Sequence, residues 1–273
     1  VSEVTEVLWE EYEAFQQRDL SAIPVLAVFL DGLYEPLRRY GIQREAILVA
    51  WAITLTGEKV LVSLTLGVRE KTDSWREFLR DLVARGLPEP LVVTTDGCPG
   101  LIRAVEEIWS QSLRVRCWVH KMRNVLAKVP EAQRSDVKRD LVAIRDATTY
   151  EAGRAAAAEF LERYGRELPS ACQSLSDDLE ASLAHLRLPW RLRPSMRSTN
   201  LIERSFVEER RRTKTIPRFF SEKSGLKLVY ATLIRAAARW QRIRIAKLEY
   251  EQLRLLYQER SITPARDLET IAA

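Results

Sequence analysis

The stretch VLAVFLDGLY, residues 25–34, decides the fold expected for this chain. Its apolar residues follow one another almost without a break after Pro24, which is typical of a strand buried on both faces. One carboxylate, Asp31, interrupts this run. A buried ionised carboxylate is costly unless a cation, backbone N–H groups or a metal ion compensates it. Asp31 is therefore either a metal ligand at the centre of the molecule or a structural Asp that pairs with a distant Arg or with the turn at Gly32.

The composition is that of a globular chain with a mildly basic surface. Of its 273 residues, 46% are hydrophobic, which supports a substantial core. Lys and Arg outnumber Asp and Glu by 43 to 38. This mild positive charge is compatible with an anionic partner but does not by itself indicate one. No apolar run approaches the roughly 20 residues of a membrane helix, and three widely spaced cysteines favour a reducing, cytoplasmic setting. The chain begins with Val1 rather than Met, so we expect a segment upstream.

The order of expected elements defines an α/β architecture. Strands are expected at residues 25–34, 45–56 and 59–67, and a short turn at Gly57 joins the last two as an antiparallel hairpin. A helix over 75–85, a strand over 91–95, a helix opening at Pro99 and a strand over 115–119 follow. Three antiparallel strands, then two parallel ones, is the order of the ribonuclease-H-like fold, a mixed sheet flanked by helices.

Helical patterns replace strands after His120. We expect an all-α insertion at residues 121–197, because about seventy helical residues exceed the handful found in a connection within one layer. The expected divisions are the first part of the core at 1–120, this insertion, core-closing basic helices at 198–247, and a C-terminal helix with a polar tail at 248–273.

Three carboxylates stand at positions that this fold brings together. Asp31 lies in the first strand, Asp96 ends the fourth, and Glu203 lies in the first turn of the helix after the insertion. Convergent carboxylates suit two Mg²⁺ ions, for which we expect Mn²⁺ to substitute. Such ions, about 3.5–4 Å apart, activate water and clamp the oxygens of a phosphoryl displacement. The structural alternatives are a turn at Asp96–Gly97 and a capping box formed by Asn200 and Glu203.

Basic residues gather around these acids. Cys117-x-x-His120 is weak as a zinc half-site, because the chain has only one other histidine, His185. Residues 203, 210 and 214 share one helical face, which would place positive charge beside the metal site for a phosphate backbone; a solvated basic face is the alternative. The residues expected to contact phosphates are His120, Lys121, Arg123, Arg204, Arg210, Arg211, Arg212 and Lys214. We expect Trp118 and Trp190 to be buried, with stacking on an unpaired base as the alternative.

Four ordered segments carry a resemblance to a known family. They are FLDGLY at 29–34, VTTDG at 93–97, CWVHKMRN at 117–124 and STNLIERSF at 198–206, the last continuing to RRRTK at 210–214. Over about residues 5–245 the chain resembles the Mutator-type transposases of bacterial insertion sequences, of the DDE class. The resemblance implies a ribonuclease-H-like core interrupted by an all-α insertion, a catalytic metal-binding triad of Asp31, Asp96 and Glu203, and a C-x-x-H element near the active site. Family members also carry an upstream helical DNA-binding region that this chain lacks, so specific end recognition is not expected of it alone.

The expected function is that of a transposase catalytic core. It would use Mg²⁺ to cleave transposon ends and would transfer the 3′-OH to target DNA. We expect transposon-end DNA and target DNA as partners, a homodimer because two ends must be joined, no membrane association, and a cytoplasmic, nucleoid-associated location in a bacterium. The alternatives are a ribonuclease-H-like nuclease or resolvase that cleaves without joining, and a non-catalytic DNA-binding derivative of a transposase.

Overall fold

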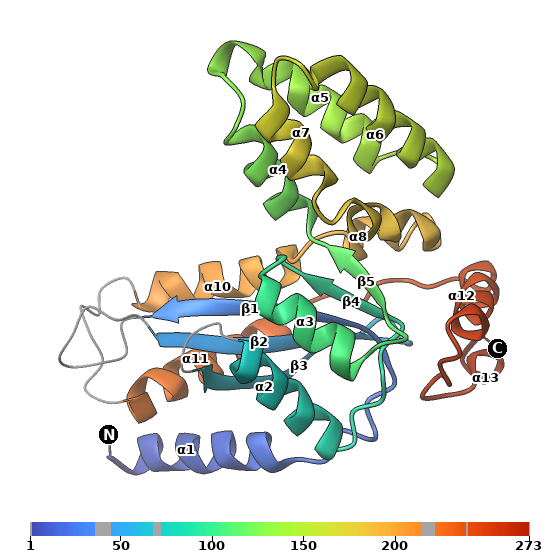
Figure 1. Ribbon diagram of the computed structural model, residues 1–273. Helices are drawn as coiled ribbons and strands as arrows, with labels where there is room; N and C mark the ends of the chain where they lie inside the picture. Colours follow the sequence, from blue (N-terminus) through green and yellow to red (C-terminus); the bar gives the residue numbers. More distant parts are fainter. Residues whose placement is uncertain (1, 36–44, 68–71, 214–221, 239, 273) are drawn as a thin grey trace.

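The computed structural model describes residues 2–35, 45–67, 72–213, 222–238 and 240–272 (Figure 1). The strands in these residues are β1 Val25–Glu35, β2 Glu45–Thr54, β3 Lys59–Gly67, β4 Val92–Thr95 and β5 Leu113–Arg116. The helices are α1 Ser2–Gln17, α2 Thr72–Ala84, α3 Pro99–Ile108, α4 Trp118–Leu126, α5 Arg134–Arg145, α6 Tyr150–Tyr164, α7 Pro169–Ser176, α8 Leu179–Leu183, α9 Arg193–Met196, α10 Asn200–Thr213, α11 Glu222–Ala237, α12 Lys247–Glu259 and α13 Leu268–Ala272. Short 3₁₀ turns are η1 Glu131–Gln133 and η2 Ala184–Arg187.

The sheet has the strand order β3-β2-β1-β4-β5. β1 pairs antiparallel with β2, and β2 with β3, whereas β4 is parallel to both β1 and β5. The predicted fold class, a mixed sheet of three antiparallel strands followed by parallel ones and flanked by helices, is therefore confirmed. Leu30 of β1 lies opposite Thr95 of β4. The residues that follow, Asp31 and Asp96, consequently stand next to each other at one edge of the sheet.

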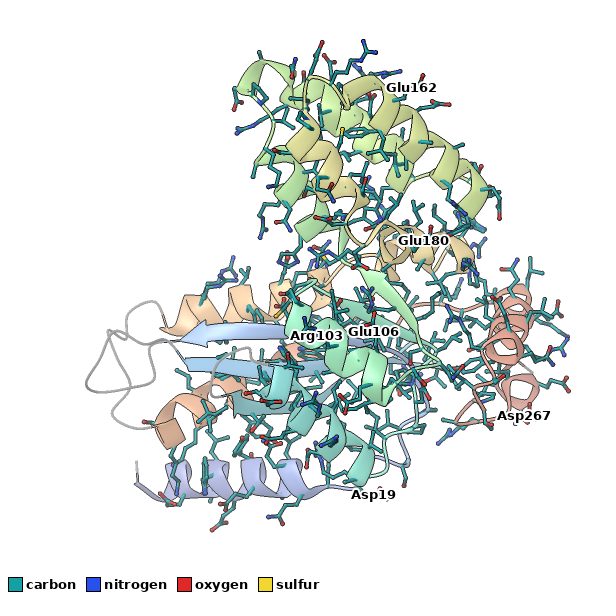
Figure 2. The ribbon with its side chains drawn as sticks, in the orientation of Figure 1. Asp19, Arg103, Glu106, Glu162, Glu180 and Asp267 are labelled. Carbon is teal, nitrogen blue, oxygen red and sulfur yellow. The ribbon has the colours of Figure 1, made fainter. Side chains whose placement is uncertain are left out.

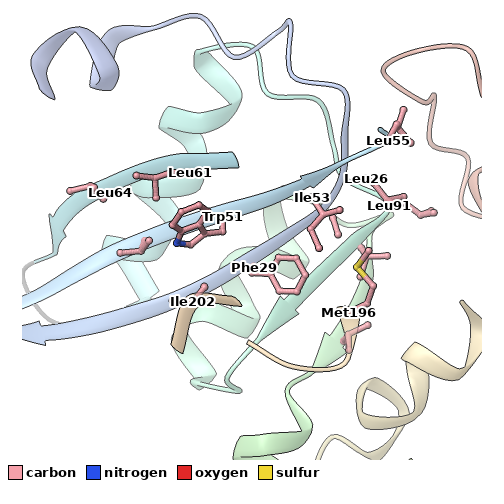
Figure 3. Packing of buried hydrophobic residues seen from close by; sticks show 14 of the residues in the cluster. Leu26, Phe29, Trp51, Ile53, Leu55, Leu61, Leu64, Leu91, Met196 and Ile202 are labelled. Carbon is pink, nitrogen blue, oxygen red and sulfur yellow. The ribbon is translucent and has the colours of Figure 1, made fainter. Parts of the chain in front are cut away.

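Apolar side chains cover both faces of β1, as its unbroken apolar run predicts. Phe29 and Leu33 belong to a buried cluster with Ile202 of α10, and Figure 3 shows Phe29 and Ile202 in this layer. Val28 and Leu30 belong to a second buried cluster with residues of α2 and α3 on the other face. Because side chains alternate along a strand, Asp31 lies on the face of Phe29 and Leu33. This is the face that α10 covers.

Helices α4 to α8 form a lobe beside the sheet with a core of its own (Figure 1). Trp118, Leu141 and Phe160 are among its buried residues. Arg114 of β5 bridges the two parts: its Nη1 donates to Asp178 at 2.7 Å, and its Nε lies 3.4 Å from Glu106 of α3. Figure 2 labels Glu106 on the sheet side of this junction and Glu180 of α8 on the lobe side.

The predicted strand at 115–119 is wrong in its position. β5 ends at Arg116, Cys117 is the N-cap residue, and α4 begins at Trp118. The β-branched and aromatic residues favour a strand locally, but contacts with the lobe override that preference. Trp118, Lys121 and Val125 are buried along one face of α4, and the Trp118 indole donates to the Ser182 carbonyl at 2.6 Å. His120 therefore lies in the first turn of a helix and not at the end of a strand.

Trp190 and the C-terminal tail differ from their expected structure. Trp118 is buried as predicted, but the predicted burial of Trp190 is wrong, because its side chain is 69% exposed and lies against the Arg191 guanidinium. The predicted polar tail contains the short helix α13 and two buried residues, Ile262 and Leu268, that pack on the core of the sheet. None of the described helices is long and apolar enough to cross a membrane.

Candidate active site

Asp31 and Asp96 are placed together by the parallel pairing of β1 with β4. Asp31 is only 9% exposed, and its Oδ1 accepts a hydrogen bond from the Gly32 N–H at 2.8 Å. Asp96 follows the last residue of β4, and its Oδ1 accepts from the Cys98 N–H at 2.9 Å. Backbone donors stabilise a charged carboxylate. One oxygen of each aspartate is therefore held by a backbone N–H group, and the two aspartates lie at the same edge of the sheet.

Glu203 reaches this edge from the first turn of α10, where its N–H donates to the Thr199 carbonyl at 2.9 Å. Three hydrogen bonds tie the preceding segment to the sheet. The Thr94 hydroxyl of β4 donates to the Met196 carbonyl at 2.7 Å, and the Trp118 N–H donates to the Arg197 carbonyl at 2.9 Å. The Thr199 hydroxyl donates to the Cys117 sulfur at 3.3 Å. The start of α10 is therefore fixed to the ends of β4 and β5.

A cavity of about 410 Å³ opens between these elements. Its polar lining consists of Asp31, Glu203, His120, Arg123 and Arg210, and its apolar lining includes Leu33 and Phe206. The cavity thus brings two of the three predicted acids together with three of the predicted basic residues. Asp96 does not line it but stands next to Asp31 through the strand register.

His120 connects the acids with Cys117. Its Nε2 lies 3.9 Å from Glu203 Oε1. A hydrogen bond with Cys117 raises the pKa of His120 against the opposing effect of burial, and the charges of Asp31 and Asp96 raise this pKa further. Burial alone would raise the pKa of the Cys117 thiol, but hydrogen bonds from His120 and Thr199 outweigh it and lower that pKa. The Cys117–His120 pair is part of this site.

The other predicted phosphate contacts are distributed differently. The prediction for Lys121 needs correction. Lys121 is 2% exposed, and its ammonium donates to the Ser174 carbonyl at 2.7 Å and to the Asp177 carbonyl. It therefore stabilises the lobe and does not face the cavity. Arg204 lies on a different face of α10 from Glu203 and lines a second cavity. Arg211 is exposed. Lys214 and the side chain of Arg212 lie outside the described residues.

Arg116 is a residue of this site that the sequence analysis missed. It is buried, which lowers its pKa, while the charge of the nearby Asp96 opposes that change. Its guanidinium packs over Gly97, where an added Cβ would lie 0.6 Å from Nη1. The signal was available, because Arg116 ends the strand next to β4 and the ends of parallel neighbours meet at one edge.

The donor chemistry of the three acids fits Mg²⁺, which prefers carboxylate oxygens. In the described part of the chain, no three His, Cys, Asp or Glu side chains converge closely enough to share an ion. Three carboxylates repel one another unless a cation balances them. As they stand in this structure, Asp31, Asp96 and Glu203 do not form a closed metal site.

The sequence pattern of the Mutator family of transposases matches residues 1–243. The chain belongs to this family. It is 31% identical over 272 residues to the transposase for insertion sequence element IS6120 of Mycolicibacterium smegmatis, which covers 97% of this chain and 84% of that protein. It is 36% identical over 235 residues to the transposase for element IST2 of Acidithiobacillus ferrooxidans, covering 85% of this chain and 78% of that protein. A third similar protein, the transposase for ISRM5 of Rhizobium meliloti, is 30% identical over 241 residues.

Membership of the Mutator transposase family confirms the resemblance drawn from the four sequence segments. Three of those segments hold the residues of the site: Asp31 lies in the first, His120 in the third and Glu203 in the fourth. Asp96, in the second segment, stands beside Asp31.

Proposed function

We propose that this Mutator-family transposase is a catalytic core that cleaves transposon-end DNA and transfers the freed 3′-OH to target DNA. The observation that carries the proposal is that acids from three separate elements lie around the carboxyl end of β4. Asp31 and Asp96 follow paired residues of β1 and β4, and Glu203 is held across from them by the anchored start of α10. Carboxylates gathered in this way are the ligands of metal-dependent phosphoryl transfer.

Asp31, Asp96 and Glu203 would hold two Mg²⁺ ions. When bound, these ions supply Lewis acidity at the scissile phosphate and lower the pKa of the attacking water. The backbone N–H groups of Gly32 and Cys98 each donate to one carboxylate oxygen of Asp31 or Asp96 and so hold the two side chains in place for metal binding. Orientation of this kind removes part of the entropic barrier to reaction.

The basic residues of the cavity bind the strand that is cut. Arg123 and Arg210 are exposed at the cavity and present guanidinium groups that match phosphate oxygens. His120, beside Glu203, is placed to donate a hydrogen bond to a phosphate in the same cavity. Because two transposon ends must be joined, we expect two copies of the chain to act together on DNA.

The test is strand cleavage by the Asp96→Asn variant. The substrate is a labelled duplex that carries the terminal sequences flanking the gene, incubated with Mg²⁺. We expect cleavage to fall about 100-fold or more, because the amide removes one anionic ligand, while DNA affinity stays within about twofold. Asp73→Asn is the matched control, since Asp73 is exposed on α2 and pairs with Arg76 at the surface.

Two results would contradict the proposal. Cleavage by Asp96→Asn at the rate of the Asp73→Asn control would remove Asp96 from the reaction. Cleavage by the wild-type chain without any product joined to target DNA would assign a nuclease and not a transposase reaction.

A further inference from the structure

A second cavity, of about 250 Å³, lies beside a different face of α10 from the candidate active site. Asn200 and Arg204 line it, whereas Glu203 and Arg210 line the active-site cavity. One residue corresponds to about 100° of helix rotation, so Arg204 is turned away from Glu203. The first turns of α10 therefore separate the two cavities.

The β2–β3 hairpin and the segment after α11 build the wall opposite α10. The Ile243 N–H donates to the Gly57 carbonyl at 2.8 Å, and an added Cβ at Gly57 would lie 1.8 Å from the Ile243 carbonyl oxygen. The Lys59 ammonium donates to the Gln241 carbonyl at 2.9 Å. Trp240 lines the cavity and packs on Trp51, with ring centroids 4.5 Å apart. The cavity is thus held open by fixed backbone contacts.

The cavity carries positive charge and lacks a counter-charge among its described lining residues. Lys59 and Arg204 both line it, and burial together with the charge of Arg204 lowers the pKa of Lys59. The nearest acid on the hairpin, Glu58, lies outside the lining and pairs with Arg242 at 2.5 Å. Two cations that face each other without an acid between them attract an anion.

Hydrogen-bond donors complete the cavity. Ser198 is 6% exposed and lines the cavity, where its hydroxyl can donate to a ligand. The Ser195 side chain lies on the same wall. Asn200 is the first residue of the 14-residue helix α10, whose N-terminal end favours negative charge.

We propose that this cavity binds a phosphodiester group of the DNA strand that leaves the active site. Lys59 and Arg204 neutralise the phosphate, Ser198 donates to one of its oxygens, and the strand passes over the first turns of α10 from one cavity to the other. This inference rests on the proposed function for the identity of the strand as DNA and for its path from the active site. Its chemistry, recognition of a phosphate anion, depends on the residues of the cavity alone.

The test compares the variant Lys59→Gln/Arg204→Gln with the matched control Arg242→Gln. Binding of a fluorescent DNA duplex is followed by anisotropy over a series of salt concentrations. The double variant should bind about five- to tenfold more weakly, and the slope of log affinity against log salt should fall by about 0.9, as expected for one lost phosphate contact. The control, whose guanidinium pairs with Glu58 outside the cavity, should keep the wild-type slope.

A second variant guards against misfolding. Ser198→Ala removes one donor and no charge, so it should weaken binding about threefold and leave the salt slope unchanged. Inorganic phosphate at constant ionic strength gives a further arm: it should raise the melting temperature of the wild-type chain by more than that of the double variant.

The outcomes separate the possibilities. An unchanged salt slope in the double variant, together with unchanged affinity in Ser198→Ala, would overturn the proposal. Loss of the phosphate-induced shift with an unchanged DNA slope would assign the cavity to a free anion and also overturn it. The catalytic proposal is tested separately, by the cleavage assay on Asp96→Asn. Its failure would be seen as DNA cleavage by that variant and does not affect the binding measurements on the cavity variants.

Discussion

Thr199 donates two hydrogen bonds to the sulfur of Cys117, one from its backbone N–H and one from its hydroxyl, each at 3.3 Å. Both residues are buried. Cys117 caps α4 at the end of β5, and Thr199 precedes α10 by one residue. The contact therefore couples the sheet edge that carries Asp96 to the helix that carries Glu203.

This coupling predicts the behaviour of Cys117→Ala. Loss of the sulfur leaves the Thr199 hydroxyl buried without its acceptor, which costs about 1–3 kcal/mol of the free energy of unfolding. Because α10 then loses one of its anchors, DNA cleavage per folded molecule should also fall. The measurements are urea unfolding and cleavage of a transposon-end duplex.

Cys172→Ala is the control for this variant. Cys172 is buried in the lobe, where its removal costs stability but leaves α10 untouched. Cys117→Ser, which keeps an acceptor, should restore part of the activity. Equal cleavage by Cys117→Ala and Cys172→Ala would show that Cys117 does not position Glu203.

Gly97→Ala tests the packing of Arg116 beside Asp96. Gly97 has φ +90°, a conformation that L residues rarely adopt, and an added Cβ would occupy the place of the Arg116 guanidinium. We expect the free energy of unfolding to fall by about 1–3 kcal/mol. Pro99→Ala, at an exposed position two residues away, should change it by less than about 0.5 kcal/mol. A thermal or urea melt in which Gly97→Ala matches this control would contradict the observed packing.

The burial of the Lys121 ammonium leads us to predict that the free energy of unfolding depends on pH. Burial lowers the pKa of its ammonium from 10.5 to about 8. Between these two pH values the unfolded state binds more protons than the folded state, so the free energy of unfolding should rise as the pH rises. The rise is at most about 1.4 kcal/mol per pH unit, and below about pH 8 the burial of the charged amine costs its full amount.

The measurement is the difference in free energy of unfolding between wild type and Lys121→Met at several pH values. That difference should shift in favour of the wild type from about pH 8 upward. Lys138→Met, at an exposed position of α5, should show a flat difference. A flat or falling difference for Lys121→Met would contradict the buried, deprotonating amine.

The sequence was sufficient for the sheet and for the pairing of Asp31 with Asp96. Long apolar runs identify strands, and the topology of parallel neighbours then places the end of β4 beside Leu30 and Asp31 of β1 without knowledge of side-chain contacts. It was insufficient at residues 115–119, because a short run of β-branched and aromatic residues suits a strand and a buried helix equally well. There the hydrogen bond from the Trp118 indole to the Ser182 carbonyl, 64 residues away, stabilises the helix.

Contacts that are distant in sequence also decide which way the predicted basic residues face. Lys121 is predicted to contact phosphates, but its ammonium donates to the carbonyls of residues 174 and 177 inside the lobe. Arg204 and Arg210 are both predicted to contact phosphates, and the helix period turns the two toward different cavities. In each case the residue type was informative about charge, and only the packing of the lobe or of α10 determines which way that charge faces.

The most direct test of the central claim is a crystal of the chain soaked in Mn²⁺ and measured at the manganese absorption edge. We predict anomalous density bounded by the carboxylates of Asp31, Asp96 and Glu203, with these side chains drawn toward it. Density elsewhere, or none at saturating Mn²⁺ while the three carboxylates stay apart, would contradict the claim that they form one metal site.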